Sequence, residues 1–136
     1  MNRYVSVAAL IVVASAFAAC DKTTSPRGGI DASFDLRSIN GTSLPYTKTL
    51  GTATLRITSD VLTLHGDGGY EESTTYSIPS GQSTQVSTTV ERGTYSASGN
   101  TITFTSKMNG SRYSGSVNGT TLTESASGGT MIYERR

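Results

Sequence analysis

Residues 70–78 read Tyr70-Glu71-Glu72-Ser73-Thr74-Thr75-Tyr76-Ser77-Ile78, and their side chains alternate in character. Tyr70, Tyr76 and Ile78 share one parity, whereas the opposite parity holds only glutamate, serine and threonine. Successive side chains of a β-strand point to opposite faces, so a period of two predicts a strand with one face toward a core and one toward water.

The same alternation recurs from Phe34 to the end of the chain. The in-phase sets are Phe34 with Leu36, Leu55 with Ile57, Leu62 with Leu64, Val86 with Thr88 and Val90, Ile102 with Phe104, Tyr113 with Val117, and Met131 with Tyr133. No segment after residue 20 has the 3.6-residue period of a helix. We therefore predict an all-β domain.

Turn sequences separate these runs at short intervals. Asn40-Gly41, Asn109-Gly110 and Asn118-Gly119 accept the positive φ angles that tight hairpin turns require. This spacing predicts an antiparallel up-and-down meander of eight or nine strands. The count depends on Ser59-Asp60, which is either a turn or a β-bulge that joins Leu55 to Leu64 in one bent strand.

A meander with one apolar face must bury that face. Closure into a small barrel buries it and removes the exposed sheet edges as well, so a barrel is our prediction and a two-sheet β-sandwich is the alternative. The faces predicted to lie outside are rich in serine and threonine. An outer-membrane barrel would instead carry an apolar band with aromatic girdles, so we expect a barrel that is not embedded in the bilayer.

The first 20 residues have the layout of a bacterial lipoprotein signal. Arg3 supplies a basic start, residues 5–17 are almost wholly apolar, and two alanines precede Cys20, the single cysteine of the chain. Such signals are cut before the cysteine, which then carries lipid. We expect residues 1–19 to be removed. The alternatives are an ordinary secretory signal with a chance cysteine and a transmembrane anchor, although a spanning helix needs roughly 20 apolar residues.

The composition after the signal narrows the set of partners. Residues 20–29 contain threonine, serine, proline and glycine and read as a flexible tether, which leaves residues 30–136 as the barrel domain. Because Arg3 is the only charged residue of the signal, the remaining chain has equal numbers of basic and acidic residues. This balance gives no reason to expect a nucleic acid partner. The predicted partner is the lipid bilayer of the cell envelope, through lipidated Cys20, with the choice of membrane left open.

Several short motifs resemble those of the bacterial lipocalin-like lipoproteins. The resemblance is carried by residues 34–41, Leu44-Pro45, Leu62-Thr63-Leu64 with Asp67-Gly68, Gly93-Thr94-Tyr95, Ile102-Thr103-Phe104 and Tyr133-Glu134-Arg135. It covers nearly all of residues 30–136. The resemblance implies a small antiparallel barrel in the cell envelope that binds an apolar ligand.

Candidate functional residues come from the inward parity of the strands. An eight-stranded barrel either fills its interior with side chains or holds one small ligand. The candidate ligand-lining residues are Tyr70, Glu72, Tyr76, Tyr95, Tyr113 and Tyr133. Arg135 is in phase with Tyr133 and is predicted to close the end of the barrel by stacking on the ring of Phe34 or a tyrosine.

Motifs for catalysis are missing from the sequence. His65 is the only histidine, and its place before the turn Gly66-Asp67-Gly68-Gly69 predicts a surface position. The chain has no Gly-x-Ser-x-Gly elbow and no second histidine or spare cysteine for a zinc site. We predict a protein that is not an enzyme, with no catalytic residue, metal or cofactor.

Two functions from different classes remain open. The first is a ligand-binding module, whose signature would be a cavity of a few hundred Å³ lined by the tyrosines. The second is a protein-interaction module, an inhibitor or assembly partner of another envelope protein. It would use the loops at 40–49 or 80–84 and an apolar patch at Leu44-Pro45-Tyr46.

Overall fold

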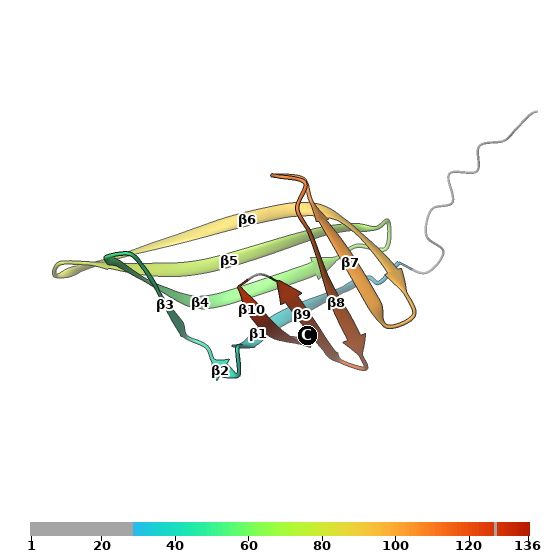
Figure 1. The fold of residues 1–136 in the computed structure, drawn as a ribbon, viewed down its shortest axis with the longest axis horizontal. Helices are drawn as coiled ribbons and strands as arrows, with labels where there is room; N and C mark the ends of the chain where they lie inside the picture. The colour runs from blue at the N-terminus through green and yellow to red at the C-terminus, as the bar shows by residue number, and fades with distance from the viewer. Residues whose placement is uncertain (1–28, 127) are drawn as a thin grey trace, which may run out of the picture.

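The computed structural model describes residues 29–126 and 128–136, which form an antiparallel β-structure without helices (Figure 1). The predicted signal, Cys20 and all but the last residue of the predicted tether lie outside these residues. In the part of the chain that the structure describes, no helix is long and apolar enough to cross a membrane.

Ten strands follow one another along the chain. They are β1 (Ala32–Ile39), β2 (Thr42–Ser43), β3 (Tyr46–Leu50), β4 (Ala53–Leu64), β5 (Gly69–Ser80), β6 (Ser83–Ser98), β7 (Thr101–Ser106), β8 (Arg112–Asn118), β9 (Thr121–Ala126) and β10 (Gly129–Arg135). The segment 40–49, expected as a loop, therefore contains β2 and most of β3.

Eight of the strands close into a barrel. The sheet runs in the order β2-β1-β10-β9-β8-β7-β6-β5-β4-β3, and a further pairing between β1 and β4 closes it. In that seam Ala32 lies opposite Leu64 and Phe34 lies opposite Leu62. Strands β2 and β3 extend β1 and β4 beyond the seam. The predicted closed barrel is confirmed, and the β-sandwich alternative is not what forms.

The uncertain segment at Ser59-Asp60 is not a turn but part of one long strand, and the bulge lies just before it, at Thr58. The pairing of β4 with β5 shifts register between Ile57 and Ser59, and the strand continues from Ala53 to Leu64 without a turn. A bulge adds a residue on one strand and bends it. This feature gives the barrel eight strands rather than nine.

The two ends of the barrel differ. The closed end holds the β4–β5, β6–β7 and β8–β9 turns, and here the Tyr95 hydroxyl lies 2.8 Å from the carbonyl oxygen of Ile30 and 2.9 Å from that of His65. At the open end the long β5–β6 hairpin and β3 project well past the short strands β7 to β10 (Figure 1).

At the open end, Asn40 ties two connections together. Asn40 and Gly41 both have positive φ, 51° and 78°, as a two-residue hairpin turn of this type requires. The Asn40 Oδ1 atom accepts a hydrogen bond of 2.9 Å from the backbone N–H of Thr130. The β1–β2 turn is thereby fixed against the start of β10.

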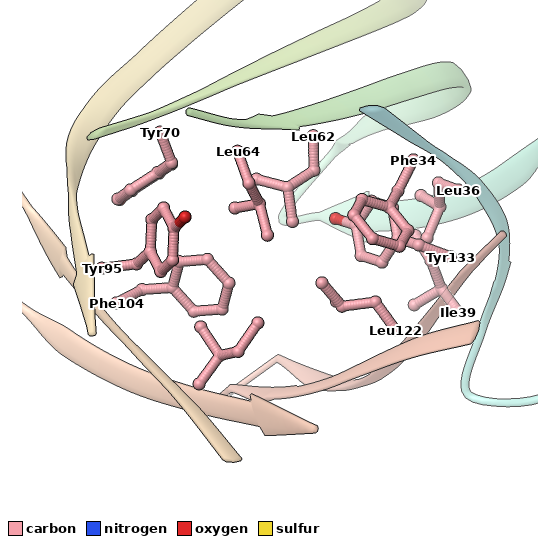
Figure 2. Packing of buried hydrophobic residues seen from close by; sticks show 11 residues of the cluster. Phe34, Leu36, Ile39, Leu62, Leu64, Tyr70, Tyr95, Phe104, Leu122 and Tyr133 are labelled. Carbon is pink, nitrogen blue, oxygen red and sulfur yellow. The ribbon is translucent and has the colours of Figure 1, made fainter. Parts of the chain in front are cut away.

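The core fills the barrel from the closed end. Figure 2 shows side chains that converge from the surrounding strands, with Tyr70, Tyr95 and Phe104 on one side and Phe34, Leu36 and Tyr133 on the other. The buried hydrophobic residues are Phe34, Leu36, Ile39, Leu62, Leu64, Tyr70, Tyr95, Ile102, Phe104, Leu122 and Tyr133. The Phe104 ring stacks on Tyr113 at a centroid distance of 5.0 Å and meets Tyr70 edge-on at 5.2 Å.

Val86 and Val90 of β6, which the alternation placed on the apolar face, do not lie on the inward face of the barrel. Val86 and Val90 are 68% and 39% exposed, and they lie opposite Ser77 and Ser73 on the outward parity of β5. The inward positions of β6 are instead in phase with Tyr95. The apolar character of two valines was a misleading signal because their half of β6 borders no core.

Candidate functional site

Four carboxylate side chains lie on the inward faces of the barrel, above the apolar core on the side of the open end. We call Asp60, Glu72, Glu91 and Glu124 the acidic cluster. Asp60 and Glu124 are 4% and 2% exposed. Burial of this much carboxylate in a barrel of this size is unusual, since acidic residues are almost never fully buried unless they are paired.

The pairing register of the strands explains why the side chains of the acidic cluster lie on the inward faces. Asp60 is in phase with Leu62 and Leu64 on β4, and Glu124 is in phase with the buried Leu122 on β9. Glu72 on β5 lies opposite Leu62 of β4 on one side and opposite Glu91 of β6 on the other. Asp60, Glu72 and Glu124 thus each occupy the inward position next to an apolar inward residue of the same strand, and Glu91 lies across from Glu72.

Hydroxyl groups hold three members of the acidic cluster. Tyr133 donates to Glu72 Oε1 at 3.1 Å, and Thr74 donates to Asp60 Oδ2 at 2.6 Å. The Tyr70 hydroxyl donates to Glu91 Oε1 at 2.6 Å. The Tyr113 hydroxyl lies 2.9 Å from that of Tyr70 and 3.2 Å from the same oxygen of Glu91.

Two buried carboxylate oxygens have no hydrogen-bond partner among the described residues. They are Oδ1 of Asp60 and Oε2 of Glu124. The described ion pairs, Arg92 with Glu71 at 2.8 Å and Arg136 with Asp35 at 2.7 Å, join partly exposed side chains of other carboxylates. An unpaired buried carboxylate is costly, so this arrangement requires a proton or another partner.

Burial and mutual repulsion favour the protonated carboxyls. Burial raises the pKa of Glu72 to about 9, and the neighbouring charges of Asp60 and Glu124 add to the effect. Burial likewise raises the pKa of Glu124 to about 7 and raises that of Asp60, which also hydrogen bonds with Glu72. Burial also raises the pKa of Tyr133 well above its usual value, so its hydroxyl remains a neutral donor.

Besides a hollow of about 540 Å³ that Asp60 lines together with Leu44 and Arg136, two hollows open near the acidic cluster. One is a cleft of about 380 Å³ lined by Glu72, Thr74, Thr89, Val90, Glu91 and Met108. It lies where β7 ends opposite Gly93, so that the earlier part of β6 has no neighbour on that side. The other is an apolar cavity of about 120 Å³ lined by Ile39, Tyr46, Lys48, Ile57, Gly128 and Met131.

The residues that were predicted to line a ligand site have different positions and contacts in the structure. Glu72 lines the cleft, whereas Tyr70, Tyr95 and Tyr133 are buried in the core and use their hydroxyls on Glu91, on backbone carbonyls and on Glu72. Tyr113 is half-buried beside Tyr70. Tyr76 lies toward the projecting end of β5, opposite Ile57.

The predicted cap of the barrel end does not form. Arg135 lies opposite Phe34 in the register of β1 and β10, but its side chain is exposed and Phe34 is fully buried. Within the described residues no guanidinium lies against an aromatic ring. Arg135 is the last residue of β10, and its long side chain extends into water, which solvates the guanidinium better than a ring does.

Sequence reasoning found Glu72 but missed Asp60, Glu91 and Glu124. The available signal was the same alternation that marks the core, because Asp60 is in phase with Leu62 and Glu124 with Leu122. Glu91 is in phase with Tyr95, four residues on. Parity alone predicts an inward direction, but it does not show that the four carboxyls meet.

The acidic cluster is not arranged as a metal site. Among residues 29–126 and 128–136, no three histidine, cysteine, aspartate or glutamate side chains come close enough together to hold one metal ion. His65 is exposed at the β4–β5 turn.

Neither a comparison with protein-family models nor one with curated proteins finds a match for this chain.

Proposed function

We propose that this chain is a non-enzymatic lipoprotein of the bacterial cell envelope whose barrel binds a small, largely apolar ligand at the open end. The signal-like residues 1–19 and the following Cys20 support the envelope address. In this proposal lipid on Cys20 holds the protein to the bilayer, and residues 20–29 link the anchor to the barrel.

The observation that carries ligand binding is the uneven filling of the barrel. Aromatic and aliphatic side chains pack the closed end, whereas the apolar cavity and the cleft lie toward the open end. A cleft of about 380 Å³ is within the range of roughly 300–1,000 Å³ that is typical of small-molecule sites. Ile39, Ile57 and Met131 provide apolar contact in the separate cavity of about 120 Å³.

Native mass spectrometry of the full chain purified from the cells that produce it tests this proposal. We expect a non-covalent small molecule that is released on denaturation. Ile57→Arg places a charge in the apolar cavity and should remove that mass, whereas Leu50→Arg, at a position 52% exposed on β3, should leave it bound. Absence of any bound mass, or equal loading of both variants, would contradict ligand binding at this end.

The anchor has its own test. Metabolic labelling with palmitate should mark the wild-type chain and leave Cys20→Ser unlabelled, with the variant shifted from the membrane to the soluble fraction. Unchanged labelling and membrane association of Cys20→Ser would contradict the lipoprotein part of the proposal.

A second candidate function, a protein-interaction module, is favoured by the edge of β6. From 84 to 91 the side of β6 that faces away from β5 has no partner strand among the described residues, since pairing with β7 begins at Gly93. The exposed Val86 and Val90 lie on this stretch. Exposed edges of this kind accept an added strand from a partner protein.

Photo-crosslinking in intact cells tests the second candidate. A photoreactive residue at Val86 should give a crosslinked product of higher mass. The same residue at Thr94, which is exposed and lies where β6 pairs with both β5 and β7, should give none. Equal crosslinking from both positions would argue against a specific partner strand.

A further inference from the structure

The buried carboxyls of the acidic cluster lack a positive partner. Asp60 and Glu124 are more than nine-tenths buried, and one oxygen of each, Oδ1 and Oε2, has no hydrogen-bond partner among the described residues. Buried carboxylates in proteins are normally paired with a cation or bound to a metal. The two ion pairs of the described residues, Arg92 with Glu71 and Arg136 with Asp35, do not involve the acidic cluster.

The four carboxyls suit an organic cation better than a metal ion. They come from four different strands, β4, β5, β6 and β9, and do not converge on one point as metal ligands must. An ammonium head offers three N–H donors and a guanidinium five, and these donors point in different directions. A guanidinium in particular spreads its donors over three nitrogens, so it can bridge carboxylate oxygens that do not converge on one point.

We propose that the acidic cluster binds the ammonium or guanidinium head of an amphiphilic organic ligand, whose apolar part occupies the cavity of Ile39, Ile57 and Met131. This inference rests on the proposed ligand-binding function and names the chemical class of the ligand. The head meets Glu72 and Glu91, the two members of the cluster that line the cleft, and the buried carboxyls of Asp60 and Glu124 act on it through their charge.

The placement of the two hollows fits a ligand of this kind. The cleft is lined by Glu72 and Glu91, so one hollow opens directly on two members of the acidic cluster. Met131, which lines the apolar cavity, lies opposite Glu124 in the register of β9 and β10. A charged head and an apolar body therefore find matching surfaces on neighbouring residues.

The hydroxyls around the cluster keep the carboxylates in place. Tyr133 holds Glu72, and Tyr70 with Tyr113 holds Glu91, each through an Oε1 atom. Neutral hydroxyl donors orient these side chains without neutralising their charge. A carboxyl that is held in this way but protonated without ligand can ionise when a cation binds.

Binding of a cation should be linked to release of protons. Without ligand, burial and the charges of Asp60, Glu124 and Glu91 raise the pKa of Glu72 to about 9, and the pKa of Glu124 is about 7. Of the other packed strands, β8 and β10 add Tyr113 and Tyr133, which stay neutral. A bound cation favours the ionised carboxyls, so affinity should rise with pH.

Matched probes test the charge of the ligand. We would titrate the full chain at pH 8 with 2-phenylethylammonium, its alcohol isostere 2-phenylethanol and the anion 3-phenylpropanoate, using calorimetry in phosphate and in Tris. We expect the ammonium to bind about tenfold or more tightly than the alcohol. The apparent enthalpies in the two buffers should differ because protons are released, and affinity should fall at pH 5.

Isosteric variants locate the site. Asp60→Asn and Glu124→Gln keep the shape of the side chain and remove a buried charge, so both variants should fold, and urea unfolding checks this. Each variant should lower the affinity for 2-phenylethylammonium about tenfold. Glu71→Gln makes the same change on the partly exposed residue that pairs with Arg92 and should leave affinity unchanged.

The remaining outcomes overturn the inference in distinguishable ways. Equal or tighter binding of the alcohol or the anion would reject a cationic head but leave the ligand-binding function in place. Ammonium binding that both variants retain would reject the acidic cluster as its site. Binding of calcium ions alone, or of none of the three probes, would reject an organic cation. The native mass measurement tests the ligand-binding function independently.

Discussion

At the scale of single residues, the buried carboxyls make the stability of this barrel depend on pH. In the folded chain the pKa of Glu72 is raised from 4.5 to about 9, so the folded state holds a proton that the unfolded chain has already lost between those values. The contribution of Glu72 to the stability of the folded chain is therefore most favourable below about pH 4.5, and it is lost as pH rises toward 9. Glu124 acts in the same direction up to about pH 7.

Thermal unfolding of the full chain without ligand should reveal this dependence. We expect Tm to fall between pH 5 and pH 8.5 by on the order of 5 °C or more, since about 1 kcal/mol corresponds to roughly 4–8 °C for a domain of this size. A Tm that rises over this interval would contradict the assignment of buried, protonated carboxyls.

The variant Glu72→Gln should weaken this dependence. The amide keeps the shape and can still accept from Tyr133, but it has no charge to desolvate. At pH 8.5 we expect Tm a few degrees above that of the wild type, and at pH 5 little difference. Glu71→Gln, which removes a carboxylate of the Arg92 ion pair, is the control and should change Tm little at either pH.

At the scale of elements, β6 needs a glycine where it crosses the barrel. A Cβ atom on Gly93 would overlap the carbonyl oxygen of Thr105 on β7 and the ring of Tyr70 on β5. The absence of a side chain allows the Tyr70 ring to lie over the strand and its hydroxyl to reach Glu91.

Gly93→Ala should therefore destabilise the domain by about 1–3 kcal/mol, as overpacking in cores does. Urea unfolding measures the loss. Gly128→Ala is the matched control, because a Cβ there meets no atom within 4 Å, and it should be close to neutral. Equal stability of both variants would show that β5 and β7 can shift to accommodate a methyl group at position 93 without loss of stability.

At the scale of the whole molecule, closure depends on the seam between β1 and β4. Phe34 lies at that seam, opposite Leu62 on β4 and opposite Arg135 on β10, and it is fully buried. One aromatic side chain thus packs where the first and last strands of the barrel meet a strand from the middle of the chain.

We expect Phe34→Ala to cost about 3–5 kcal/mol in the free energy of unfolding, the usual loss for a buried phenylalanine. Val86→Ala removes apolar surface that is 68% exposed and should stay within about 0.5 kcal/mol. Chemical denaturation followed by circular dichroism measures both. A small effect of Phe34→Ala would mean that the seam contributes little to closure.

Much of this fold could be predicted from local pattern alone. The runs at Phe34, Leu62, Ile102 and Leu122 all proved to be inward faces, and the reading of the segment at Ser59-Asp60 as part of one bulged strand is confirmed. The stretch around Val86 was read wrongly because propensity does not reveal whether a strand segment borders a core. The arginine cap failed for a related reason, since parity does not show whether a long side chain at the end of a strand extends into water.

The sequence by itself determined an all-β chain with short turns, an apolar face and a lipoprotein-like start, because these signals are local and have a period of two or a fixed order. Only the tertiary structure decided that Asp60, Glu72, Glu91 and Glu124 share one interior. Their meeting depends on the register of four strands and on closure of the barrel between β1 and β4. Those pairings join residues far apart in the chain, and no local pattern specifies them.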